Sequence, residues 1–98
     1  MIRHVVMFKF KPEVDKQARV DFAQKLSQLA LDIDVIRALE IGQNFALSPR
    51  ASDIVLIVDV DDEEALRVYD DHPKHLPVKQ LSTQLCSESR VVDYVLAD

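Results

Sequence analysis

The stretch IRHVVMFKFK, residues 2–11, decides the fold because both of its alternating rows carry apolar side chains. Successive side chains of a strand point to opposite faces of the sheet. One row holds Ile2, His4, Val6, Phe8 and Phe10, and the other holds Arg3, Val5, Met7, Lys9 and Lys11. A strand with one face in water has polar residues throughout one row, so Val5 and Met7 indicate that the second face is also covered.

The stretch DIVLIVDV, residues 53–60, repeats this two-sided pattern. Its first apolar row consists of Ile54, Leu56, Val58 and Val60, and its second row includes Val55 and Ile57. An apolar patch left on the surface usually marks an interface. Two sheets that meet face to face in a symmetric pair cover both rows. We therefore expect a homodimer formed through the sheet face.

Two further segments follow the first strand. Pro12 ends the strand pattern and suits a first helical position, and apolar residues spaced by three or four predict a helix over about 13–31. The stretch VIRALEIGQNF, residues 35–45, predicts a second strand, and residues 44–53 have the composition of a loop. Gly42, the chain's one glycine, indicates a bulge or close backbone packing.

The acidic stretch DDEEALRVY, residues 61–69, predicts a short helix from about 62 to 70. Asp61 and Glu64 have the spacing of a capping box, and acidic residues in a first turn complement the helix dipole. A divalent cation site is the alternative explanation of this acidic run. A third helix is expected from Leu76 to Leu85, and RVVDYVLA, residues 90–97, predicts a fourth strand.

The resulting order of elements is β-α-β-β-α-α-β. This order suits an α+β, ferredoxin-like fold with a four-stranded antiparallel sheet and helices on one face. A chain of 98 residues fits one domain, so we expect a single domain over residues 1–98.

Composition excludes several classes of partner. The formal net charge is −5 and the basic residues are scattered, which argues against nucleic-acid binding. No apolar run reaches the roughly 18 residues needed to span a bilayer, so no membrane partner is expected. The N-terminal stretch lacks a secretory pattern, which predicts a cytoplasmic location. The one cysteine, Cys86, is expected to be a small apolar residue late in the third helix.

The stretch YDDHPKH, residues 69–75, holds the candidate catalytic residues. Histidine titrates near neutral pH, so His75 can remove a proton from carbon next to a carbonyl while Tyr69 donates a hydrogen bond to the developing oxyanion. His72 precedes Pro73 and is therefore expected to cap or hinge the two helices.

Each candidate also has a structural interpretation. Tyr69 can bury its ring with its hydroxyl on a backbone carbonyl, and His75 and His4 can hydrogen-bond each other or a strand carbonyl. A metal site built from His4, His72 and His75 has no carboxylate or cysteine fixed nearby by a motif. We expect no metal and no cofactor.

Four stretches together resemble the stress-responsive α/β-barrel (Dabb) family over essentially the whole chain. They are IRHVVMFKFKPEV at 2–14, IRALEIGQNF at 36–45, DEEALRVYDDHPKH at 62–75 and VVDYV at 91–95. The resemblance implies a dimeric α+β barrel in which two ferredoxin-like subunits pack through their sheets.

A few plant relatives in that family are polyketide cyclases, which close a linear poly-β-keto chain by intramolecular aldol condensation. Their catalytic tyrosine and histidine are similar in position to Tyr69 and His75, and Leu26 stands where they have another pocket tyrosine. The remaining residues expected to line a ligand cavity are His4, Val6, Phe8, Phe22, Leu56 and Val58.

Two functional hypotheses follow from the sequence. In the first, the protein is an enzyme or binder of a small polyketide-like or other carbonyl-bearing molecule. In the second, it is a noncatalytic stress-associated protein whose important property is its stable dimer.

Overall fold

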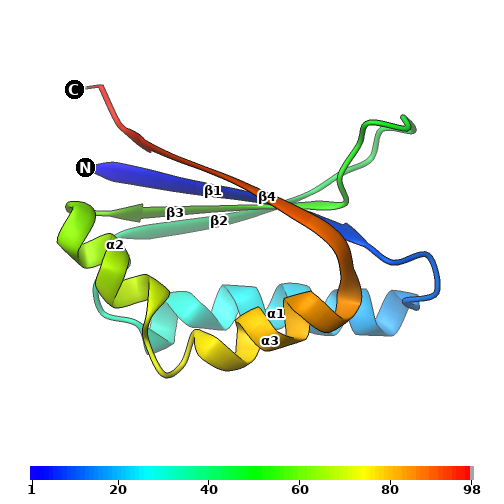
Figure 1. Ribbon diagram of the computed structural model, residues 1–98, viewed down its shortest axis with the longest axis horizontal. Helices are drawn as coiled ribbons and strands as arrows, with labels where there is room; N and C mark the ends of the chain where they lie inside the picture. The colour runs from blue at the N-terminus through cyan, green and yellow to red at the C-terminus, as the bar shows by residue number, and fades with distance from the viewer. Residues whose placement is uncertain (98) are drawn as a thin grey trace.

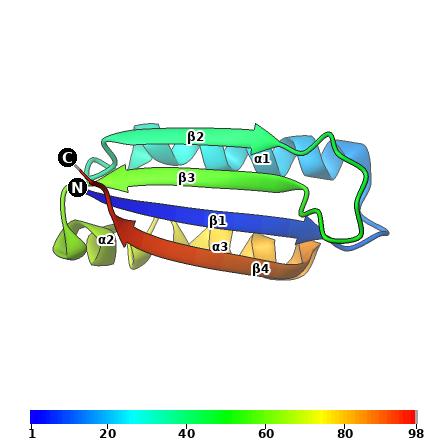
Figure 2. The ribbon, with the colours of Figure 1, turned by 90° about the horizontal axis from the view of Figure 1, so that it is seen from above.

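The computed structural model describes residues 1–97 and contains four strands and three helices in the predicted order (Figure 1). The elements are β1 (Ile2–Phe10), α1 (Lys16–Asp32), β2 (Ala38–Gln43), β3 (Ile54–Val60), α2 (Glu63–Asp70), α3 (Leu76–Leu85) and β4 (Cys86–Val95). The sheet has the order β2-β3-β1-β4 with every neighbouring pair antiparallel (Figure 2). The ferredoxin-like α+β prediction is therefore confirmed.

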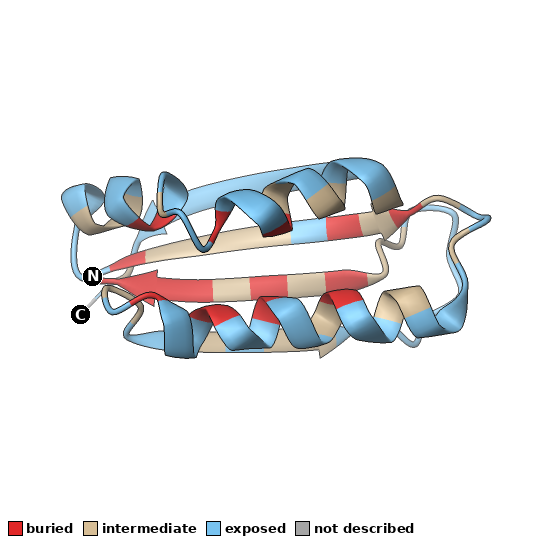
Figure 3. Ribbon diagram, turned by 90° about the horizontal axis from the view of Figure 1, so that it is seen from below, coloured by how far each residue is buried: buried red, intermediate tan, exposed pale blue. Residues whose placement is uncertain are grey.

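All three helices lie on one face of the sheet, and the other face is bare (Figure 1). The core lies between α1 and the helix-side rows of β1 and β3, where the buried residues gather (Figure 3). Phe22 and Leu26 of α1 and Leu56 and Val58 of β3 are almost completely buried. Each such side chain contributes about 1.5–3 kcal/mol relative to exposure, which fixes α1 against the sheet.

The bare face carries the second apolar row that the sequence predicted. Val5 pairs with Ile57 on one side and with Val92 on the other, so apolar side chains run across three strands. Met7 and Val92 are 42% and 59% exposed, respectively. This bare face, formed by β1, β3 and β4, is called the open face below.

Two helices begin differently from the prediction. Helix α1 begins at Lys16 rather than near 13, because the Asp15 carboxylate accepts from the Ala18 amide at 2.8 Å and Pro12 lies in the preceding turn. Helix α2 is capped by Asp62, which accepts from the Ala65 amide at 2.8 Å. Asp61 lies one residue too early to reach that amide.

Asp61 pairs instead with Arg37, whose guanidinium donates at 3.0 and 2.8 Å to the two carboxylate oxygens. Among residues 1–97 no three His, Cys, Asp or Glu side chains are grouped to hold a metal ion. In that same range, no helix is both long and apolar enough to cross a membrane.

The last strand is longer than predicted, beginning at Cys86 rather than at 90. Cys86 has extended backbone angles and pairs with Phe10, next to a shift in the register between β1 and β4, so it is not a late helical residue. The stretch CSES has no apolar alternation, and pairing with β1 is what makes it a strand.

The close packing expected at Gly42 is also present. A Cβ added there would lie 3.0 Å from Val55 Cγ1, whereas the irregular pairing of this sheet lies between β1 and β4, where the register skips Ser87.

Candidate functional site

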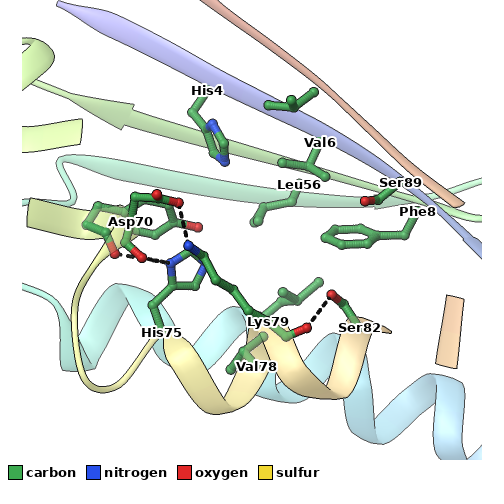
Figure 4. A pocket seen from close by; sticks show the side chains of 13 residues that line it. His4, Val6, Phe8, Leu56, Asp70, His75, Val78, Lys79, Ser82 and Ser89 are labelled. Carbon is green, nitrogen blue, oxygen red and sulfur yellow. Dashed lines mark hydrogen bonds and ion pairs between the residues drawn. The ribbon is translucent and has the colours of Figure 1, made fainter. Parts of the chain in front are cut away.

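A cavity of about 260 Å³ lies between the sheet and helices α2 and α3 (Figure 4). The helix-side rows of the strands supply its apolar wall, and the helices supply most of its polar groups. It is lined by His4, Val6, Phe8, Leu26, Leu56, Tyr69, Asp70, His75, Val78, Lys79, Ser82, Ser89 and Val91. This combination of apolar wall and a few converging polar groups is typical of small-molecule sites.

The turn between α2 and α3 brings Tyr69 and His75 together. The His72 carbonyl accepts from the amides of His75 at 2.9 Å and Leu76 at 3.2 Å, and His72 Nδ1 accepts from the Lys74 amide at 3.0 Å. His72 therefore shapes the turn, as predicted. The Tyr69 ring stacks on the His75 imidazole, with ring centroids 4.3 Å apart.

His75 is held in one tautomer. Its Nδ1 lies 3.1 Å from the Tyr69 carbonyl oxygen and 3.2 Å from that of Asp70. Carbonyl oxygens only accept hydrogen bonds, so Nδ1 must carry the proton and Nε2 is the basic nitrogen. Burial lowers the pKa of His75, so the neutral imidazole predominates at pH 7.

The Tyr69 hydroxyl is buried and has no hydrogen-bond partner among the described residues. The structural interpretation in which this hydroxyl binds a backbone carbonyl is therefore wrong. Burial raises the pKa of Tyr69, with a smaller contribution from Asp70, so the phenol stays protonated and remains a donor. A buried polar group without a partner requires an explanation, and a ligand acceptor supplies one.

His4 contacts Tyr69 from the strand side. Its ring meets the Tyr69 ring edge-on at 5.5 Å, and its Nδ1 donates to the Asp93 carboxylate at 2.5 Å. His4 thus bonds neither His75 nor a strand carbonyl, which were the two expected partners. Figure 4 shows His4 pointing from β1 toward the helices, above His75.

The structure brings most of the predicted site residues together, but two of them do not line the cavity. Phe22 and Val58 are fully buried in the core. The Phe22 ring packs edge-on against Phe8 at 5.2 Å and against Phe10 at 5.7 Å, so Phe8 is the aromatic residue that faces the cavity. The apolar character of Phe22 and Val58 alone could not show whether they belong to the core or to the wall of the cavity.

Several lining residues were missed by sequence reasoning. Val78, Lys79 and Ser82 follow His75 at three, four and seven positions, which is one helix face, so their spacing was an available signal. Ser89 and Val91 share a strand row with Asp93, the partner of His4. That row could not be recognised without the register between β1 and β4.

Known proteins resemble this chain in sequence and in fold. The family model described as the stress responsive A/B barrel domain, Dabb, matches residues 2–96. The uncharacterised protein SCO4036 of Streptomyces coelicolor is 34% identical over 77 residues, which cover 76% of this chain and 79% of that protein.

Solved structures also share the fold, and two of them serve as examples. A dimeric ferredoxin-like protein of unknown function from Thermobifida fusca is 24% identical, with a TM-score of 0.87 over 97% of this chain and 90% of its own. A hydroxynitrile lyase from Passiflora edulis is 14% identical, with a TM-score of 0.87 over 99% of this chain and 94% of its own. At these identities the likeness to the two structures concerns the fold alone. The family match, in contrast, spans almost the whole sequence, so the chain belongs to the Dabb family of stress-responsive A/B barrel proteins.

Proposed function

We propose that this protein binds a small carbonyl compound in the cavity and catalyses proton transfer at the carbon next to that carbonyl. The observation that carries the proposal is the anchoring of His75 Nδ1 by two backbone carbonyls, which leaves Nε2 as the basic nitrogen of a ring that stacks on Tyr69, whose hydroxyl has no partner among the described residues. The hydroxynitrile lyase of Passiflora edulis supports the proposal only as an example of an enzyme with this fold.

The proposed step uses both groups at once. His75 Nε2 takes a proton from the α-carbon, and the electron pair of that C–H bond moves toward the carbonyl oxygen. The oxygen becomes an enolate oxygen and accepts a hydrogen bond from the Tyr69 hydroxyl. The enolate carbon then takes a proton back from His75, or it attacks a second carbonyl and closes a ring in a polyketide-like substrate. In the second case the carbonyl that is attacked becomes an alkoxide, which takes the proton from His75 and restores the base.

The opposite pKa shifts of the two groups support these roles. Burial lowers the pKa of His75, which keeps the base unprotonated at pH 7. Burial also raises the pKa of Tyr69, which keeps the donor protonated. Two titratable groups whose surroundings push them toward different protonation states are the usual sign of an acid and base pair.

Hydrogen–deuterium exchange at carbon tests the proposal directly. Acetophenone and 4-phenyl-2-butanone are incubated with the protein in D2O, and loss of the α-proton signals is followed by NMR. We expect the wild type to accelerate exchange over buffer, and His75→Gln to reduce the acceleration by about 10²-fold or more. Tyr69→Phe should reduce it by roughly 10²-fold, because one oxyanion donor is lost.

Lys74→Gln is the control, because Lys74 lies in the same turn and its side chain does not line the cavity. Circular dichroism of each variant checks that the fold is retained. Equal exchange rates for the wild type and His75→Gln, with both proteins folded, would refute the catalytic proposal.

We also propose that two copies pair through their open faces. The apolar row across β1, β3 and β4 supports this pairing, and the Thermobifida fusca protein is described as dimeric. Val92→Glu places a charge in the middle of the proposed interface, so the dimer dissociation constant should rise more than about 100-fold. Val68→Glu, on the exposed side of α2, is the control.

Sedimentation equilibrium at micromolar concentration measures both variants beside the wild type. A monomeric wild type, or a Val92→Glu variant that is as dimeric as the control, would contradict pairing through this face. A cytoplasmic location stays a prediction from the sequence.

The noncatalytic hypothesis makes a different prediction from the catalytic one. If the dimer alone matters, His75→Gln should change thermal stability without any effect on exchange at carbon. The open face favours a dimer under both hypotheses, so the exchange experiment separates them and the sedimentation experiment does not.

A further inference from the structure

Lys79 and Asp70 form an ion pair beside the two proposed catalytic groups. The Lys79 Nζ lies 2.8 Å from Asp70 Oδ1, and Figure 4 shows the lysine side chain extending toward that carboxylate. Among the described residues that line the cavity, Lys79 carries the one fixed positive charge and Asp70 the one fixed negative charge. The polar end of the cavity therefore contains a lysine ammonium group that is paired with a carboxylate of the protein itself.

The backbone places Lys79 one helical turn after His75. The Lys79 amide donates to the His75 carbonyl at 3.0 Å, which is the spacing of neighbours on one helix face. The Cβ atoms of such neighbours are about 5–6 Å apart. A ligand whose carbonyl lies at His75 Nε2 and the Tyr69 hydroxyl can therefore present a second polar group to Lys79 a few bonds away.

The ion pair is weak enough to be exchanged. The Lys79 and Asp70 side chains are 39% and 55% exposed, and pairs this open to solvent contribute little to stability. A carboxylate brought in by a ligand can replace Asp70 as the partner of Lys79, while the Asp70 side chain turns to water. The Asp70 backbone carbonyl, which anchors His75, need not move.

We propose that the ligand is an oxo acid, a carbonyl compound that carries a carboxylate a few bonds from its carbonyl, and that Lys79 binds this carboxylate in place of Asp70. The apolar remainder of the ligand lies against Phe8, Leu26 and Leu56, which line the opposite wall. This inference rests on the proposed function, since it assumes that the carbonyl lies at Tyr69 and His75.

Paired acid and ester probes test the inference. Binding of 4-oxo-4-phenylbutanoate and of its methyl ester is measured by calorimetry, together with the shorter pair of levulinate and methyl levulinate. We expect the wild type to bind each acid about 10-fold more tightly than its ester. Lys79→Met should reduce this ratio to about one, and 0.5 M NaCl should reduce it in the wild type by screening.

Two further variants complete the design. Asp70→Asn should raise the acid-to-ester ratio, because the internal competitor for Lys79 loses its charge. Lys74→Met, a lysine that does not line the cavity, should leave the wild-type ratio unchanged.

The outcomes separate this inference from the proposed function. Suppose that the esters bind to the wild type and that His75→Gln weakens their binding. If the wild type then shows no preference for the acids, or if Lys79→Met retains that preference, only the oxo-acid inference is overturned. If neither the acids nor the esters bind to the wild type, the proposed function and this inference fail together.

Discussion

The Tyr69→Phe variant should be more stable than the wild type in the absence of ligand. Tyr69 is completely buried, and its hydroxyl has no hydrogen-bond partner among residues 1–97. Phenylalanine removes the hydroxyl and keeps the ring, which stacks on His75 at 4.3 Å and meets His4 edge-on at 5.5 Å. The substitution therefore removes a desolvation cost and leaves the packing in place.

The magnitude follows from the cost of an unsatisfied polar group. A buried donor without a partner costs about 1–3 kcal/mol. We take the low end, because Tyr69 lines a cavity, and expect the free energy of unfolding to rise by about 1 kcal/mol. For a domain of this size that corresponds to an increase in Tm of roughly 4–8 °C.

Thermal unfolding followed by circular dichroism measures this change, with the protein concentration held constant because dimerisation shifts Tm. Leu31→Ala is the control, since Leu31 is 78% exposed on helix α1, away from the open face, and its change should stay within about 0.5 kcal/mol. A Tyr69→Phe variant less stable than the wild type by 1 kcal/mol or more would mean that the hydroxyl has a partner that stabilises the fold. The hydroxyl would then need no ligand acceptor.

Two further predictions concern the helices around the site. Burial holds the pKa of His75 in the folded protein below its ordinary value of 6.5, so the unfolded chain binds this proton more readily than the folded protein does. The stability that depends on neutral His75 is therefore full above about pH 6.5 and is lost as pH falls below that value. The decrease in Tm between pH 7.5 and pH 5.0 should therefore be smaller in His75→Gln than in the wild type, and equal decreases would contradict the shift. Asp62→Ala should lower stability by about 1 kcal/mol in urea unfolding, because the cap of α2 is lost. Asp61→Ala should have a smaller effect, and the reverse order would contradict the assignment of the cap.

Local sequence signals located the elements better than their ends. Alternation in β1 and β3 and the three-to-four spacing in α1 were strong because one face of each element is buried. The start of β4 was missed because CSES acquires its strand conformation only by pairing with β1. The cap of α2 was missed by one residue because two adjacent aspartates offer the same chemistry, and only geometry selects Asp62.

Some residues of the candidate site could likewise be identified from the sequence, and others could not. Tyr69 and His75 could be chosen from the sequence because a short turn between two helices keeps them near each other. Asp93 could not be chosen, since it lies 89 residues from His4 and only the sheet register joins them. Phe22 could not be excluded, because core and cavity wall draw on the same apolar residues.

The sequence alone determined the order of elements, the helix-side row of each central strand and the presence of a second apolar row. These features depend on periodicity, which local backbone geometry imposes on any chain that buries one face. The tertiary structure decided the tautomer of His75, the unpartnered hydroxyl of Tyr69 and the ion pair of Lys79 with Asp70. Those features depend on distances between atoms of packed side chains and folded backbone, which no pattern of residue types specifies.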